Sequence, residues 1–330
     1  MTVPSGALRF NSDSGKLEYY NGEAWWQIDN FSADNATGGA RGVFGGGYTN
    51  TPSSFTNIID YITISTTGNA IDFGDLPTAR QDAHATASNT RGLFAGGSPG
   101  INTIEFVTIS STGNSTFFGQ LTRITIYHYG CSSQTRALYC GGISSGTLSN
   151  IIDYVTIAAT GNAVDFGDLT VPRDRHSSFA SPTRGIIAGG RSATPLTATN
   201  VIDYVTISTL GNAADFGDVY NTAHFASGCS NSTRGIIGGS YNPTQNVIQY
   251  ITIASLGNSQ DFGDLTVARF ALSSAASSTR GVFRGGETPT MQNVIDYVTI
   301  MSTGNAIDFG DATTTTTSVS GGFSNGHGGL

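Results

Sequence analysis

Three histidines fall at similar places in successive stretches of the sequence. His84, His128 and His176 lie 9, 8 and 8 residues after motifs of the FGD type. Imidazoles bind metals well, but a shared ion needs ligand nitrogens within about 4 Å of one another. Equivalent positions in neighbouring structural repeats lie farther apart, so we expect these histidines to line a central channel. We predict no metal site and no cofactor.

The remaining charged residues also argue against catalysis. The sequence has no phosphate loop, H-E-x-x-H or C-x-x-C motif, and a catalytic site brings unlike groups to one point. Here the same groups recur once per repeat, so we expect structural hydrogen bonds and ion pairs between strands, because buried charges persist only when paired. The recurring residues are Arg41, Arg91, Arg136, Arg184, Arg234 and Arg280, and Asp72, Asp165, Asp215, Asp261 and Asp308, with Phe117 replacing the acid once.

The three cysteines do not form a disulfide framework, because an odd number cannot all pair. Cys131 and Cys140 flank a predicted hairpin turn, where a bridge is one alternative. Small buried thiols are the other, since unpaired cysteine is commonly buried.

Composition indicates an all-β protein. Of 330 residues 44 are glycine and only 12% are charged, whereas long helices favour the lysine, glutamate and leucine that are scarce here. The net charge of −8 opposes binding to nucleic acid. No apolar run is long enough to span a membrane, and we expect no insertion into one and no export signal.

The sequence contains six copies of one repeat. The stretch "NVIDYVTIMSTGNAIDFGD" covers residues 293–311, and near copies begin at residues 57, 102, 150, 200 and 246. The distance from the "IDY" acid or Gln249 to the end of "FGD" is constant at 15 residues, whereas the preceding interval from the repeated arginine varies from 14 to 19. We therefore predict four strands per repeat and one loop of variable length. Periods of this size are typical of propellers and solenoids.

The order of these segments resembles the kelch repeat. An apolar run ending in Gly-Gly precedes a Tyr-Asp-like strand, then an aromatic at Phe73, then "LPTAR" and "QDAHATA". The resemblance covers residues 41–330, although phenylalanine stands where kelch repeats usually have tryptophan. It implies a six-bladed kelch-like β-propeller of four-stranded blades. The first repeat lacks an innermost strand, and the match of Ser320-Gly321 with Ser227-Gly228 predicts that residues 313–325 supply it and close the ring.

Residues 1–40 are predicted to be a separate β-hairpin module with a linker. The stretch "GALRFNSDSGKLEYYNGEAWWQI" has two turn signals between short strands. It resembles a short module of bacteriophage virion proteins, especially tail fibres, which implies an attachment role for Tyr19, Tyr20, Trp25 and Trp26. Packing of the tryptophans against one end of the propeller is the alternative.

In an antiparallel four-stranded blade, the connections from strand two to three and from four to one emerge on the same face. All length variation thus falls on one face, and loops on rigid scaffolds commonly bind partners. The recognition candidates are Tyr48, Phe55, Arg191, Tyr241 and Met291 in these loops, and Tyr127, His128 and Tyr129 near the channel. The alternatives are that the loops drift without function and that the aromatics plug the channel.

These features together predict a non-enzymatic structural protein of a phage virion. We expect a tail fibre or receptor-binding component, present in many copies, that contacts other virion proteins through residues 1–40 and a host glycan or protein through one propeller face. A capsid or baseplate decoration protein is the first alternative. A propeller-fold carbohydrate-active enzyme is the second.

Overall fold

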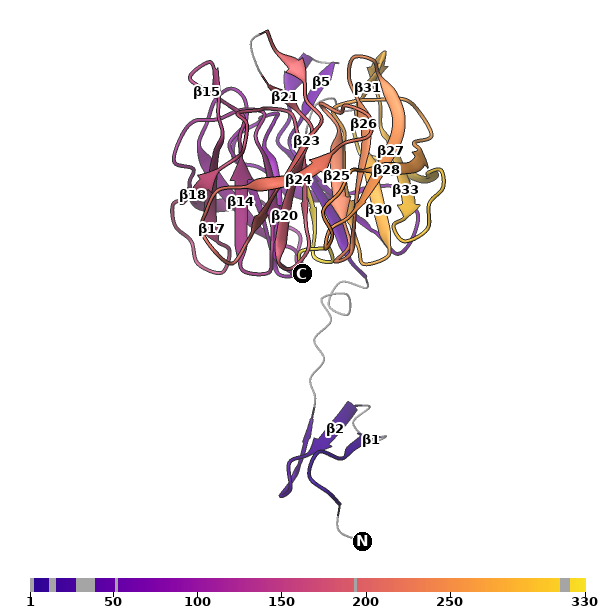
Figure 1. Cartoon of the computed structure of the whole chain (residues 1–330). Coiled ribbons are helices and arrows are strands. Elements are labelled where there is room, and N and C mark those ends of the chain that lie inside the picture. Colours follow the sequence, from indigo (N-terminus) through magenta and orange to yellow (C-terminus); the bar gives the residue numbers. More distant parts are fainter. Residues whose placement is uncertain (1–2, 12–15, 28–38, 51–52, 193–194, 315–320) are drawn as a thin grey trace.

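The computed structural model describes residues 3–11, 16–27, 39–50, 53–192, 195–314 and 321–330, and its regular elements are all β-strands (Figure 1). Six four-stranded antiparallel sheets share one strand order, from an innermost to an outermost strand. The first sheet contains β35 (Gly321–Ser324), β4 (Arg41–Gly45), β7 (Ile58–Thr63) and β8 (Ile71–Asp75). The second contains β9 (His84–Ala87), β10 (Arg91–Ala95), β11 (Thr103–Thr108) and β12 (Thr116–Gln120).

The other four sheets repeat this plan. The third contains β13 (Tyr129–Ser132), β14 (Arg136–Cys140), β17 (Ile151–Thr156) and β18 (Val164–Asp168). The fourth contains β19 (Ser177–Ala180), β20 (Arg184–Ala188), β23 (Val201–Thr206) and β24 (Ala214–Asp218). The fifth contains β25 (Ser227–Ser230), β26 (Arg234–Ser240), β27 (Gln245–Thr252) and β28 (Gln260–Asp264). The sixth contains β29 (Ser273–Ala276), β30 (Arg280–Arg284), β33 (Val294–Thr299) and β34 (Ile307–Asp311).

The innermost strands contact one another in a closed cycle. β9 contacts β13, and the cycle continues through β19, β25, β29 and β35 back to β9. Each sheet therefore faces a neighbour on both sides, which explains the apolar residues on both faces of the third strands. The arrangement is consistent with the blades of a β-propeller.

The C-terminal strand completes the first sheet, as predicted. β35 pairs with β4 through Gly321↔Gly45 and Ser324↔Gly42. The predicted register was wrong by one residue, because Gly321 takes the place that Ser227 has in the fifth sheet. The link before β35 is one residue longer than its counterparts. Residues 315–320, including Ser320, lie outside the described residues.

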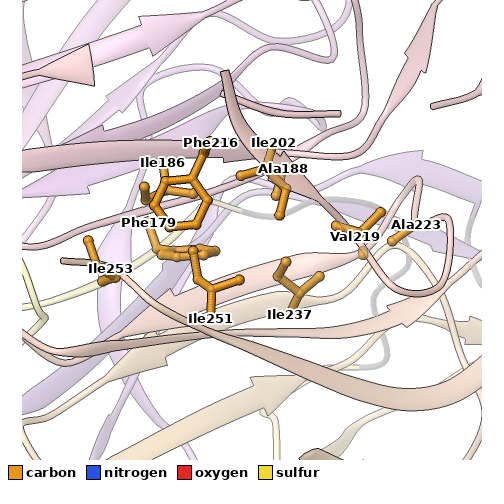
Figure 2. Packing of buried hydrophobic residues seen from close by; sticks show 11 residues of the cluster. Phe179, Ile186, Ala188, Ile202, Phe216, Val219, Ala223, Ile237, Ile251 and Ile253 are labelled. Carbon is orange, nitrogen blue, oxygen red and sulfur yellow. The ribbon is translucent and has the colours of Figure 1, made fainter. Parts of the chain in front are cut away.

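Apolar residues between neighbouring sheets form the core. Figure 2 shows the cluster between the fourth and fifth sheets, where Phe216 and Ile186 of one meet Ile237 and Ile251 of the other. In all six sheets the phenylalanine of the FGD-type motif packs edge to face on the aromatic ring of the third strand, as Phe73 does on Tyr61 with a centroid distance of 5.9 Å. Such contacts contribute about 0.5–1.5 kcal/mol beyond burial.

The Gly-Asn turn of each sheet docks on the outermost strand of the preceding one. Gly113 N donates to Phe73 O at 2.7 Å, and Asn114 Oδ1 accepts from Asp75 N at 3.0 Å. The same pair of bonds recurs at all six junctions, including Gly68 and Asn69 against Phe309 and Asp311. A Cβ on Gly74 would lie 2.5 Å from Gly113 O. The glycine of the motif is thus required by close backbone approach.

Four connections between the second and third strands form small hairpins. They are β5 (Tyr48–Asn50) with β6 (Ser53–Phe55), β15 (Ile143–Ser144) with β16 (Thr147–Leu148), β21 (Arg191–Ser192) with β22 (Thr197–Ala198), and β31 (Glu287–Thr288) with β32 (Thr290–Met291). Figure 1 shows β5, β15, β21 and β31 along one rim of the sheets. In the fifth sheet β26 and β27 themselves extend to the turn.

The N-terminal segment forms a sheet of its own. β1 (Leu8–Asn11), β2 (Lys16–Tyr20) and β3 (Trp25–Gln27) pair in sequence order as an antiparallel meander. The predicted linker up to residue 40 lies mostly outside the described residues. Across the described ranges, no helix is long and apolar enough to cross a membrane.

Ring closure is testable at Gly92, because a Cβ there would lie 1.9 Å from the ring of Phe323 in β35. We expect Gly92→Ala to destabilise the protein by about 1–3 kcal/mol through overpacking, measured by urea unfolding. Gly161→Ala is the matched control, since nothing lies within 4 Å of its added Cβ. Equal stability of the two variants would contradict packing of β35 against the second sheet.

Candidate functional site

The six innermost strands enclose a central cavity. Its lining comes from every sheet and consists mainly of small residues such as Thr86, Ser132, Ser178, Ser230, Ser274 and Ser324. Two of these serine hydroxyls are hydrogen-bonded to backbone carbonyls: Ser132 Oγ donates to Ala87 O at 2.8 Å, and Ser230 Oγ donates to Ala180 O at 2.7 Å. The serines thus join neighbouring sheets.

The last residues of the chain lie against one end of this cavity. His327 Nε2 lies 2.8 Å from Ala87 O, and Gly328 N donates to Ser230 O at 2.8 Å. Burial lowers the pKa of His327 to about 4, so its imidazole is neutral at pH 7. A Cβ on Gly329 would collide with Ser132 O at 1.8 Å, which shows how closely this segment packs.

Strained residues lie at the opposite end, before five of the six innermost strands; the residues before β35 lie outside the described part of the chain. Among the described residues seven other than glycine have positive φ, and five share one repeat position, seven residues after the FGD-type motif. We call these five the mouth ring: Asp82, Tyr127, Arg175, Phe225 and Ala271, with φ of 52–56°. Each such conformation costs of order 1–3 kcal/mol, and such residues concentrate at functional sites.

Backbone hydrogen bonds link the mouth ring from one sheet to the next. Arg175 N donates to Tyr127 O at 3.1 Å, Phe225 N donates to Arg175 O at 3.0 Å, and Ala271 N donates to Phe225 O at 2.7 Å. These three bonds join Tyr127, Arg175, Phe225 and Ala271 in one chain across four sheets. The left-handed conformation is therefore accompanied by hydrogen bonds between sheets.

Arg175 is held between two aromatic rings. Its guanidinium carbon lies 3.6 Å from the Tyr127 ring centroid and 4.4 Å from that of Phe225. Its Nη1 donates to Asp174 Oδ2 at 2.5 Å, and Arg191 donates to both oxygens of the same carboxylate at 3.1 and 2.7 Å. The candidate Arg191 is thus engaged in an ion pair rather than free to bind an anion.

Further aromatics extend this cluster at the mouth. Tyr241, at the turn of the fifth sheet, is 44% exposed, and its ring lies 4.6 Å from Phe270 and 6.2 Å from Phe225. His224 packs on Tyr241 at a centroid distance of 5.6 Å. Residues from the fourth, fifth and sixth repeats are thereby joined with Tyr127 in one aromatic surface.

Asp82 lies beneath this surface and is 1% exposed. Burial raises the pKa of Asp82 to about 7, although the charge of Arg175 and a hydrogen bond from Gln81 lower it. Burial also raises the pKa of Tyr127, with the Asp82 charge as a further cause, so the two groups lie close together.

The inner aromatics fill the space below the mouth ring. Tyr129 is 1% exposed and packs on His84 and His176 at centroid distances of 4.4 and 5.3 Å. It also belongs to a small buried cluster with Ala271 from the far side of the cycle. The plug alternative is therefore the one that the geometry of Tyr129 supports.

Of the three histidines predicted to line the channel, His128 and His176 are buried and His84 is half-buried. Burial lowers the pKa of His84 and of His176 to about 3, and that of His128 well below its usual value. His84 Nδ1 accepts from Gly130 N at 2.9 Å, and His128 packs on Tyr139. Within the described ranges no group of three potential metal ligands occurs.

The other loop candidates lie on the hairpins. Tyr48 and Phe55 are a cross-strand pair of β5 and β6, with centroids 5.9 Å apart. Met291 ends β32 opposite Glu287. Tyr48 and Phe55 thus lie on a different hairpin from Met291.

The repeated arginines make structural hydrogen bonds to backbone carbonyls, and the ion pairs expected between strands do not use the repeated acids. Each lies over the aromatic ring of its own third strand and donates to a carbonyl of the next sheet, as Arg41 does with Tyr61 and Ile109 O. Arg280 closes the cycle on Ile64 O. The acids at the Asp72 position are exposed, because they alternate with the buried phenylalanine.

Buried ion pairs use the acid of the third strand instead. Five sheets have such a pair: Glu105 with Arg80, Asp153 with Arg123, Asp203 with Arg173, Asp296 with Arg269, and Asp60 with Arg284. The fifth sheet has a neutral equivalent, in which Gln249 exchanges hydrogen bonds with the backbone of Asn221. In the pairs of Arg80, Arg123, Arg173 and Arg269 the arginine lies in the link before the sheet, so the pair fixes that link to the sheet, whereas Arg284 belongs to β30 and joins the sixth sheet to the first.

All three cysteines are buried free thiols, as the second alternative for Cys131 and Cys140 predicted. The two side chains lie within hydrogen-bonding range, and this contact, together with burial, raises the pKa of Cys140 well above its usual value.

The attachment candidates lie on opposite faces of the N-terminal sheet. The register places Tyr19 opposite Leu8 and Trp26, on a face whose side chains are 40–62% exposed. Tyr20 and Trp25 pack on each other on the other face, where Arg9 lies 4.1 Å from the Trp25 ring. Among the described side chains, the exposed apolar ones Leu8, Tyr19 and Trp26 share the first face.

No family model matches the chain, and no curated protein resembles it closely enough to count as a match. The sequence analysis missed Asp82, Arg175, Phe225 and Phe270. A signal existed, because the sixth and seventh positions after the FGD-type motif have a different side chain in each of the five repeats from Gln81-Asp82 to Phe270-Ala271.

Removing one member of a buried pair should be costly. Arg173 Nη2 lies 2.8 Å from Asp203 Oδ2, and both side chains are fully buried. We expect Arg173→Met to lower the free energy of unfolding by about 3–5 kcal/mol, because an uncompensated carboxylate remains. The double variant Arg173→Met/Asp203→Leu should lose less free energy of unfolding than Arg173→Met, because it leaves no buried charge unpaired. Equal losses in urea unfolding would contradict this account.

Asp82 predicts a pH dependence of stability. Its folded pKa of about 7 exceeds the usual 3.8, so the native state binds the proton more tightly and stability falls as pH rises from about 4 to 7. Arg175, Gln81, Tyr127 and Tyr129 are polar groups that face it. Asp82→Asn should remove this part of the slope, as measured by urea unfolding between pH 4 and 8. An unchanged slope would show that Asp82 titrates normally.

Proposed function

We propose that the chain is a six-bladed, kelch-like propeller that serves as a structural component of a phage virion, most simply a tail fibre or receptor-binding protein. The six sheets in a closed cycle and the completion of the first sheet by β35 support the propeller. The resemblance of residues 6–28 to a virion attachment module supports the location.

The observation that most favours recognition is the segregation of variation to one rim. The Gly-Asn turns are tied to the neighbouring sheet at every junction, so their length cannot drift. The hairpins at the opposite rim differ in length from sheet to sheet. A rigid ring with adaptable loops at one end suits the binding of a partner.

The open face of the N-terminal sheet is the proposed attachment surface. Leu8, Leu17, Tyr19 and Trp26 are 62%, 44%, 40% and 57% exposed, respectively. A three-stranded sheet needs an apolar face covered to be stable, and a small patch rich in aromatics is typical of interface anchors. We propose that other virion proteins bind this face and bury its apolar side chains.

Attachment is tested by changing this face within the full-length protein. We expect Trp26→Ser to reduce incorporation into purified particles about tenfold or more, since aromatic anchors often contribute 2 kcal/mol or more to an interface. Glu23→Ser, at an exposed turn, is the matched control. Quantitative mass spectrometry of particles measures both.

Two results would argue against the proposal. Absence of the wild-type protein from purified particles would remove the virion role. Turnover of host envelope glycans by the purified protein would favour the carbohydrate-active enzyme. Labelling on the head or baseplate in electron micrographs would favour the decoration protein over the tail fibre.

A further inference from the structure

The repeat loses its uniformity where each innermost strand is about to begin. At the junctions between sheets the six units keep the same glycine, asparagine, arginine and phenylalanine, because every junction makes the same contacts. In the mouth ring a carboxylate, a phenol, a guanidinium, a phenyl ring and a methyl group occupy equivalent left-handed positions. Glycine would remove the strain at each of them. Unlike side chains gathered at one end of a symmetric scaffold are what a binding site requires.

We propose that the aromatic surface over the mouth ring binds a neutral saccharide, with Tyr241 as its exposed stacking platform. This inference rests on the proposed recognition function and names its ligand class and site. The surface consists of Tyr127, Phe225, Tyr241 and Phe270, with Arg175 between the first two. Sites for small ligands are typically aromatic with a few placed polar groups.

The charges around the surface decide against an ionic ligand. Arg175 and Arg191 share the Asp174 carboxylate. Arg175 also faces Asp82, and Glu287 pairs with Phe270 at the same surface. The acids therefore balance the two guanidinium charges and leave no excess positive charge to attract a phosphate or carboxylate. The Arg175 charge already occupies the faces of Tyr127 and Phe225, which excludes an ammonium group from the same place. With anionic and cationic ligands both disfavoured, we expect an uncharged ligand at this surface.

The surrounding loops supply groups suited to hydroxyls. The connection "SYNPTQ" carries Tyr241, and "ETPTMQ" meets the surface where Glu287 pairs with Phe270. These two connections contain serine, threonine, asparagine and glutamine, with Glu287 as their single charged residue. Such side chains both donate and accept hydrogen bonds. A saccharide offers an apolar ring face to Tyr241 and hydroxyls to this rim, whereas an apolar peptide would use little of the rim.

The test uses the full chain with two variants. Saturation-transfer NMR with methyl glycosides of glucose, galactose, mannose and N-acetylglucosamine should detect binding of at least one, with glucuronic acid as the anionic comparator. An array of immobilised oligosaccharides distinguishes a surface glycan from a free sugar. Tyr241→Ala should weaken binding about tenfold, as expected for loss of an aromatic contact of about 1.4 kcal/mol. Tyr220→Ala should leave it unchanged, because Tyr220 is 69% exposed and belongs to no ring pair.

The proposal is overturned if no neutral saccharide binds in either format, if glucuronic acid binds better, or if Tyr241→Ala binds as the wild type does. Capture of a host protein with every saccharide inert also overturns it. Circular dichroism confirms that both variants fold. Saccharide binding by a protein absent from particles would instead refute the virion role and leave this site standing.

Discussion

The docking of each Gly-Asn turn on the outermost strand of the preceding sheet is the contact on which the ring depends. It joins backbone to backbone, so it tolerates no side chain at the glycine of the FGD-type motif. Because it recurs at every junction with nearly the same distances, the six sheets are held at one spacing and one rotation. The hydrophobic clusters between sheets then fill a gap whose width is already set.

Uniform junctions make departures from the repeat informative. The second sheet replaces an exposed aspartate by Phe117 without loss of a contact, whereas Asp60 finds Arg284 from another sheet when its own link offers none. Buried charge must be compensated wherever the partner comes from. At the mouth ring, by contrast, variety is retained although it strains the backbone. The residue type is thus fixed by backbone contacts at the junctions between sheets, whereas at the mouth ring it differs from sheet to sheet.

Much of the architecture follows from the sequence because repetition, glycine turns and strand-length segments are local signals. The closing strand was predictable by counting, but its register was not, since the extra residue lies in a threonine-rich link without landmarks. The acid pairs escaped prediction because Arg173 and Asp203 are 30 residues apart and meet only through the sheet. Tyr127, Arg175 and Phe225 meet only because the cycle closes. Asp72 recurs at a regular position beside a buried phenylalanine, and this regularity suggested a buried ion-pair partner. Successive residues of a strand point to opposite faces, so Asp72 is exposed.

Completion of the first sheet by β35 has a consequence for synthesis of the protein. Arg41 N bonds to Asn325 Oδ1 across 284 residues. At ordinary translation rates the ribosome needs roughly 15–60 s to cover that distance. Throughout this interval β4 has an unpaired edge, because its partner β35 has not yet been synthesised. Crowded polysomes, where identical edges emerge side by side, are therefore the setting in which this molecule is most exposed to mispairing.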